Sequence, residues 1–195
     1  MSPKPNSKQS AGKAKGPTAA ELRAQQQAGQ RQRRAADRSA LEAHFQGGVP
    51  GQRIIIGTWV ATALLAIGQT VGLLSSHGRA HPSGGEQIAA LISLTLFGLG
   101  LVSFCFAIYA GAQRSRTSTF AVGGWFLLAG AAPTSTRASL LGSVAAQMAI
   151  GIAAASIRPF SVLAYGTLVW LLGLGLCGVW GARYGFFPDR PDPRP

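Results

Sequence analysis

The sequence predicts an all-α membrane protein in which four antiparallel transmembrane helices follow a basic N-terminal arm that is partly disordered and partly helical. Four apolar runs, each of at least twenty residues, contain no Asp, Glu, Lys, Arg or His. At about 1.5 Å per residue, a helix of that length crosses a hydrocarbon core of roughly 30 Å. The Lys and Arg residues all lie outside these runs. The expected spans are 54–74, 88–112, 138–157 and 161–182.

The N-terminal arm precedes the first span and divides into two parts. Residues 1–17 are rich in Lys, Ser, Pro and Gly and offer almost nothing to bury, so we expect them to be disordered. Capping-box patterns that begin at Thr18 and Ser39 predict helix over 18–46, which Gly29 could divide into two shorter helices. The expected domains are the arm 1–53, the four-helix membrane domain 54–183 and a cytoplasmic Pro- and Arg-rich tail 184–195.

The formal net charge of +12 would suit a nucleic-acid partner, but the positions of the charges argue against one. Ten of the eighteen Lys and Arg residues precede Ile54, and the others flank apolar runs. An anionic leaflet attracts each nearby Lys or Arg by about 1 kcal/mol, so the arm could contact lipid headgroups or a partner. A solvated basic arm that orients the first span is the simpler interpretation. The candidate contacts are Arg31, Arg33, Arg34 and Arg38.

The loop after the first span contains the candidate metal ligands of the sequence. His77 and His81 are four residues apart, and Glu86 follows them. Gly78 and Pro82 argue against a regular helix that would put both histidines on one face. We therefore favour a solvated loop and expect no metal site and no cofactor.

The loop between the second and third spans contains an uncharged segment, 120–133, with Trp125, Phe126, Leu127 and Leu128. Fourteen residues are too few to cross the hydrocarbon core. We favour an interfacial segment that lies flat at the cytoplasmic headgroups. A re-entrant loop is the alternative, and it would need internal partners for its backbone.

The third and fourth spans are joined only by Arg158, Pro159 and Phe160, so we expect these two helices to be antiparallel and in contact. The fourth span leads into the ending Gly181-Ala182-Arg183-Tyr184-Gly185-Phe186-Phe187-Pro188. Over roughly residues 54–190, this combination resembles a family of small four-span bacterial membrane proteins of unassigned function. The resemblance implies the four-span fold and no activity.

The distribution of basic residues predicts the orientation of the spans. If the N-terminus is cytoplasmic, sixteen of the eighteen Lys and Arg residues lie on that side, and only Arg79 and Arg158 lie on the other. Basic residues accumulate on the cytoplasmic side of membrane proteins. We therefore expect a multi-pass protein of the cell (cytoplasmic) membrane with both termini in the cytoplasm.

Small residues recur four apart within the spans, as Gly68 and Gly72 do in the first. Such columns let helix backbones approach closely in lipid, where packing replaces the hydrophobic drive. They either hold this bundle together or bind another membrane protein, and the sequence leaves both open, with internal packing favoured. The candidate packing residues are Gly68, Gly72, Ser103, Ala107, Gly111, Gly142, Ala146, Gly173, Cys177 and Gly181.

Two glutamines, Gln69 and Gln147, are the long polar side chains inside the spans. We interpret them as donors and acceptors of interhelical hydrogen bonds rather than as substrate ligands.

The spans lack ionisable side chains, which disfavours an ion-coupled transporter or pump. No carboxylate pair or activated nucleophile is evident, so we do not expect an enzyme. The favoured function is structural or accessory: a scaffold that binds a membrane protein partner or a second copy of itself, in contact with anionic headgroups at the cytoplasmic face. The alternative is a small oligomeric transporter or lipid-handling protein.

Overall fold

The computed structural model describes residues 19–75, 83–118 and 122–187, apart from the side chains of 19–22, 33–34 and 122–123. The expected disorder at 1–17, the end of the C-terminal tail, and His77 and His81 lie outside these residues. The described elements are α1 (Ala19–His44), α2 (Gln52–Ser75), α3 (Gly84–Arg114), α4 (Val122–Phe126), α5 (Thr134–Ile157), the 3-10 helix η1 (Val162–Leu168) and α6 (Trp170–Tyr184).

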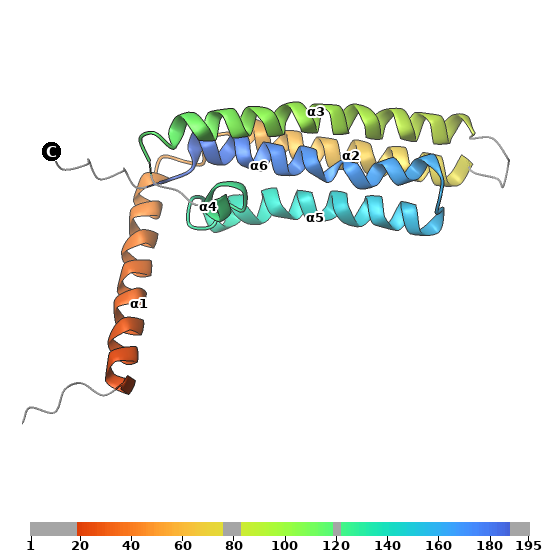
Figure 1. Cartoon of the computed structure of the whole chain (residues 1–195). Coiled ribbons are helices and arrows are strands. Elements are labelled where there is room, and N and C mark those ends of the chain that lie inside the picture. The colour runs from red at the N-terminus through yellow and green to blue at the C-terminus, as the bar shows by residue number, and fades with distance from the viewer. Residues whose placement is uncertain (1–18, 76–82, 119–121, 188–195) are drawn as a thin grey trace, which may run out of the picture. The chain divides into compact units, whose positions relative to one another are not determined.

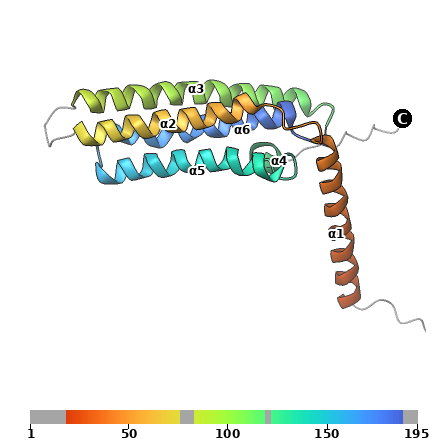
Figure 2. The same cartoon turned by 180° about the vertical axis from the view of Figure 1, so that it is seen from behind.

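Four long helical segments lie side by side with alternating direction: α2, α3, α5 and the continuous pair η1–α6 (Figures 1 and 2). Each is long and apolar enough to cross a membrane. The all-α class with four spanning helices is therefore confirmed, and the architecture is that of a multi-pass membrane protein.

The chain forms two compact units, residues 1–38 and 39–195. The first contains most of α1, which is one continuous helix. Gly29 does not divide it, and a Cβ at this position would meet nothing within 4 Å. The second unit contains the membrane bundle.

The helices of the first three spans begin before their apolar runs do, whereas the fourth begins at Val162, one residue after the expected start. α5 starts at Thr134 rather than 138, because a polar first turn can extend beyond the hydrocarbon core. α3 starts at Gly84 with a capping box: the Ser83 N–H donates to Glu86 Oε2 at 2.7 Å, and the Glu86 N–H donates to Ser83 Oγ at 3.3 Å.

The fourth span differs from the uniform α-helix that its length suggests. Its first seven residues wind as the 3-10 helix η1, and α-helix begins only at Trp170. The segment includes Val162, Tyr165, Gly166 and Thr167, which all have modest or poor α-helix propensity. The tighter 3-10 winding occurs where η1 and α5 are in backbone contact. This contact is shown by Gly151 of α5, on which a Cβ would lie 2.5 Å from the Gly166 carbonyl oxygen.

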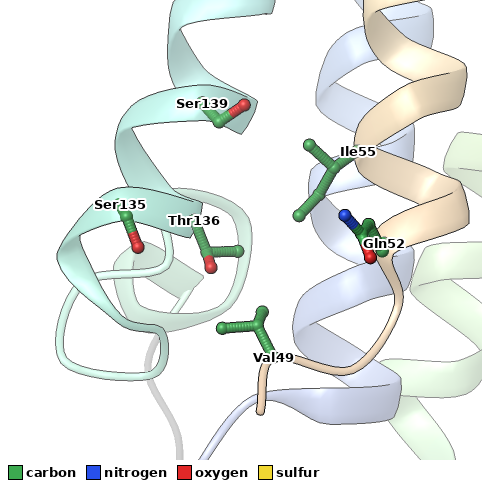
Figure 3. A pocket seen from close by; sticks show the side chains of 6 residues that line it. All are labelled: Val49, Gln52, Ile55, Ser135, Thr136 and Ser139. Carbon is green, nitrogen blue, oxygen red and sulfur yellow. The ribbon is translucent and has the colours of Figure 1, made fainter.

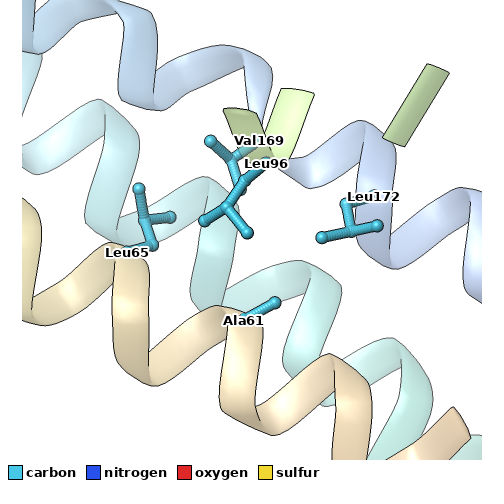
Figure 4. Close-up of a cluster of buried hydrophobic side chains, with 5 residues drawn as sticks. All are labelled: Ala61, Leu65, Leu96, Val169 and Leu172. Atoms are coloured by element: carbon cyan, nitrogen blue, oxygen red, sulfur yellow. The ribbon is translucent and has the colours of Figure 1, made fainter. Parts of the chain in front are cut away.

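The fourth span, which ends with α6, is the most buried of the four spanning segments. Half of the fourth span is buried inside the protein, compared with a third or less of each other span. Its most extensive contact is with α3, where glycines bring the two backbones together. A Cβ on Gly100 would lie 2.6 Å from the Leu172 backbone nitrogen, and one on Gly175 would lie 2.8 Å from that of Phe104. One core cluster joins three of the helices at this level (Figure 4), and its members are Ala61, Leu65, Leu96, Val169 and Leu172.

The segment 120–133 folds against the end of the bundle in its described part. Trp125, Phe126 and Leu128 are buried, and the Trp125 indole N–H donates to the Gly178 carbonyl oxygen at 2.9 Å. Phe126 stacks on Phe104 of α3, with ring centroids 5.3 Å apart. The rings of Trp125 and Phe126 are thus covered by α3 and α6, where small residues leave room for them, while Leu128 packs with Leu140 of α5 and Trp180 of α6.

The same end of the bundle is fastened by Arg114 at the end of α3. Its guanidinium donates to the carbonyl oxygens of Ala182 and Gly185, both at 2.7 Å. These carbonyl groups belong to the last turn of α6 and the residue after it, where a helix has no internal donors left.

Candidate functional site

A buried polar seam runs between α2 and α5. The Gln147 Nε2 group of α5 donates to Thr62 Oγ1 of α2 at 3.0 Å and lies 3.5 Å from the Thr58 carbonyl oxygen. The Thr62 hydroxyl donates to that same carbonyl oxygen at 2.8 Å, which leaves its oxygen free to accept from Gln147. All three side chains are buried. Gln147 therefore forms an interhelical hydrogen bond.

The other side of the Gln147 amide has no hydrogen-bond partner. Its Oε1 atom is buried and accepts no hydrogen bond from any described residue. It lies beside α6, where a Cβ on Gly173 would be 2.8 Å away. A buried acceptor without a donor carries a desolvation cost. The presence of the Gln147 amide is therefore not explained by its contribution to the stability of the fold alone.

Gln69 makes a similar link between α2 and α3. Its Nε2 group donates to Ser93 Oγ at 3.1 Å, and the Ser93 hydroxyl donates to the Ala89 carbonyl oxygen at 2.8 Å. The Gln69 amide fills the space beside Gly166 of η1. Its Oε1 atom, like that of Gln147, accepts no hydrogen bond from the described part of the chain.

The seam leads toward a cavity of about 350 Å³ where α2 and α5 begin (Figure 3). Beyond the cavity wall, the Trp59 indole N–H donates to Ser139 Oγ at 3.0 Å and ties the two helices together. Four of the six lining residues are polar and none is charged, although apolar atoms form the larger part of the lining surface: Val49, Gln52, Ile55, Ser135, Thr136 and Ser139.

The small residues singled out in the sequence occupy different environments. Several face neighbouring helices, including the short helix α4: a Cβ on Gly68 would be 3.1 Å from Ile92, one on Gly72 would be 2.9 Å from Ala89, and one on Gly181 would be 2.5 Å from the Trp125 carbonyl oxygen. Gly111 faces Trp125 and Gly173 faces Gln147, while Ala107 and Cys177 are fully buried.

Three of the candidate packing residues are less enclosed. A Cβ on Gly142 would meet nothing within 4 Å, and Ala146 is only half-buried. Ser103 is also half-buried, with its hydroxyl bonded to the Leu99 carbonyl oxygen of its own helix at 2.7 Å. The structure therefore does not bring Gly142 against another helix.

The four arginines of the arm belong to α1. Arg31 and Arg38 are exposed, and the side chains of Arg33 and Arg34 lie outside the described part. Within the described residues, no group of three or more His, Cys, Asp or Glu side chains is placed to hold a metal ion. Glu86 is occupied by its capping box.

The cavity and its polar lining residues were not predicted from the sequence. The signal available was the run Thr134-Ser135-Thr136 directly before an apolar span, which marks a polar first turn. Nothing in the sequence showed that this turn would face the start of α2, because the two segments are more than eighty residues apart.

Comparison of the chain with protein-family models, curated proteins and solved structures gave no match. The assignment of the chain as a multi-pass membrane protein rests on its four apolar helices.

Proposed function

We propose that this protein is an accessory protein of the cytoplasmic membrane, in which the bundle is the anchor and α1 is a basic arm that recruits a partner with an acidic surface. The observation that carries the proposal is the exposure of α1. Within its own unit, every described side chain of α1 from Arg23 to Arg38 is exposed, and the one residue that is less exposed is Gly29.

Most helices in proteins gain their stability by burying an apolar face. In α1, Leu41 is the described large apolar side chain that is half-buried, and it lies at the end that leads into the bundle. The exposed side chains of Arg23, Arg31 and Arg38 outnumber the acidic Asp37 over the same stretch. A long, basic and unburied helix is suited to an acidic protein surface, with complementary charge that speeds encounter and selects the partner.

The bundle itself supports an anchoring role. Its interior is filled by side chains and by close backbone contacts between α3 and α6, and its spans carry no ionisable group in the apolar runs. Ion-coupled transporters ordinarily need such groups within the membrane.

The proposal is tested by purifying the full chain from native membranes in a mild detergent and measuring the stoichiometry of any co-purifying protein. Replacing Arg31, Arg33, Arg34 and Arg38 by Gln should reduce recovery of the partner about tenfold or more. The matched control replaces Gln25, Gln26, Gln27 and Gln30 by Ala on the same helix, and it should retain the partner. If the wild-type chain yields no partner in a fixed ratio, or both variants retain it equally, the recruiting role is excluded.

A second candidate function, a small oligomeric transporter or lipid-handling protein, is favoured by the polar cavity that adjoins the α2–α5 seam. Movement of a solute or lipid across liposomes that contain the pure protein would favour this candidate. Flux equal to that of empty liposomes would count against it.

A further inference from the structure

We infer that the cavity at the N-terminus of α5 binds a phosphate group, supplied either by the headgroup of an anionic lipid or by free phosphate. The inference does not depend on the recruiting role of α1. It rests on the donors that surround the cavity and on Thr136, a mostly buried residue whose hydroxyl is accessible from the cavity and has no hydrogen-bond partner among the described residues.

The first turn of α5 presents unbonded backbone N–H groups. The residue before the helix is Pro133, which provides no side-chain cap. The first N–H with a backbone acceptor is that of Arg137, which donates to the Pro133 carbonyl oxygen at 3.0 Å. No described residue accepts from the N–H groups of residues 134–136. Such a turn is a favourable place for an anion, because the N–H groups and the helix dipole both present positive charge.

The Thr136 side chain is the second, independent observation. It is only 4% exposed, it lines the cavity, and its hydroxyl has no hydrogen-bond partner among the described residues (Figure 3). A threonine that is bonded to its own helix would not need a ligand, as Thr62 and Thr70 illustrate. Because the rest of the Thr136 residue is buried and its hydroxyl is accessible from the cavity, this unused donor can be given only to an acceptor that occupies the cavity.

Further donors surround the same space. Ser135 and the amide of Gln52 line the cavity from α5 and α2. Ser139 accepts from the Trp59 indole, so its own hydroxyl hydrogen remains available to donate. No acidic side chain is among the lining residues. Donors from two helices, without a carboxylate, suit the several oxygens of a tetrahedral anion.

The charge and position of the cavity favour phosphate. Arg53 and Arg137 directly follow the lining residues Gln52 and Thr136 in the chain, and both are exposed. The Arg137 Nε group donates to the Leu127 carbonyl oxygen at 3.0 Å, which holds this cation near the first turn of α5. The cavity lies where two apolar spans begin, which is the depth of lipid headgroups in a bilayer. A lipid phosphate can therefore reach it from the membrane, and a free phosphate from the aqueous side.

The test uses the delipidated full chain in detergent with three probes: phosphatidylglycerol, a glucosyl diacylglycerol with the same acyl chains but no phosphate, and inorganic phosphate. Binding is measured by native mass spectrometry and by the shift in melting temperature. We expect phosphatidylglycerol to bind and the glucosyl lipid to bind at least about tenfold more weakly. Displacement of phosphatidylglycerol by inorganic phosphate would show that the phosphate group suffices, and its retention would assign the site to the lipid headgroup.

The variant Thr136→Val combined with Ser135→Ala removes two hydroxyl groups with little change in shape and should weaken phosphatidylglycerol about tenfold or more. Thr136→Ser keeps the hydroxyl and should retain binding. The matched control, Thr70→Val with Ser156→Ala, makes the same chemical change where both hydroxyls bond to their own helices at exposed positions. Equal binding of the two lipids, or equal binding by the double variant and its control, would overturn the inference.

Discussion

At the scale of single residues, three tryptophan indoles connect parts of the chain that are distant in sequence. Trp59 donates to Ser139, Trp125 donates to Gly178, and Trp180 donates to the Pro50 carbonyl oxygen at 3.0 Å. A buried indole brings a large apolar surface and one donor that must be satisfied. The contacts of the buried Trp125 and Trp180 therefore fix both the packing and the direction of a neighbouring segment, whereas Trp59 is 45% exposed.

Trp180→Phe should lower the free energy of unfolding by at least about 1 kcal/mol, because it leaves the Pro50 carbonyl group without its donor. The measurement is SDS or thermal unfolding in detergent. Trp170→Phe is the control for the smaller ring, since Trp170 is half-buried and its indole has no acceptor among the described residues. A loss at Trp170 as large as that at Trp180 would show that ring size, not the hydrogen bond, determines the result.

Replacing Gln147 by Met should not lower the free energy of unfolding, in contrast to replacing Trp180 by Phe. Gln147→Met keeps the approximate shape and removes the buried Oε1 that has no donor, while Thr62 keeps its bond to the Thr58 carbonyl oxygen. We expect unfolding free energy to be unchanged or to rise by up to about 1 kcal/mol. Gln147→Ala, which leaves a cavity, should instead destabilise the fold by about 2 kcal/mol or more. A large loss of stability in the Met variant would mean that the amide oxygen has a partner in the folded protein.

At the scale of helices, α3 and α6 approach so closely that Gly100 and Gly175, which lie in the contact, have no room for a methyl group. Columns of small residues are visible in the sequence, but the sequence does not show which of them lie in the closest contacts between helices. α6 has glycines on several faces and is buried on nearly all of them, so a four-residue spacing alone does not reveal that Gly175 and Gly178 meet α3. The change from 3-10 to α winding in the fourth span could not be predicted either, because the length and hydropathy of a segment do not distinguish a 3-10 helix from an α-helix.

Gly100→Ala should destabilise the bundle by about 1–3 kcal/mol, because the new methyl group would lie 2.6 Å from the Leu172 backbone nitrogen and cannot move aside. The matched control is Gly98→Ala on the same helix, where nothing lies within 4 Å, and there the gain in helix propensity should leave stability unchanged or slightly higher. Unfolding in SDS checks both. Similar values for the two variants would contradict the close contact of α3 with α6.

At the scale of the whole molecule, the four-span architecture could be predicted because each span is recognisable in the sequence by its length and by the absence of charged side chains. The candidate site could not. The cavity is formed by residues near 50 and near 136, and the donors of Gln147 find their acceptors on α2, so each feature depends on how distant helices meet. The covering of Trp125 and Phe126 by α3 and α6 also depends on tertiary packing rather than on the hydropathy of that segment.

The orientation of the spans remains a prediction and can be measured directly. In a variant without the native Cys105 and Cys177, a cysteine at Ser83 should react with a membrane-impermeant thiol reagent in intact cells, and a cysteine at Ser115 should react only after lysis. These positions flank opposite ends of α3. The reverse pattern would place both termini outside the cytoplasm.

The burial of the fourth span has a consequence for biosynthesis. This most buried segment is the last of the four to leave the ribosome, so α3 and α5 enter the bilayer before the helix that packs against both of them exists. During that interval, the glycine-lined face of α3 around Gly100 stays uncovered. Assembly is therefore expected to finish only after translation of the last span, and quality-control proteases or an insertase would meet an open three-helix intermediate until then.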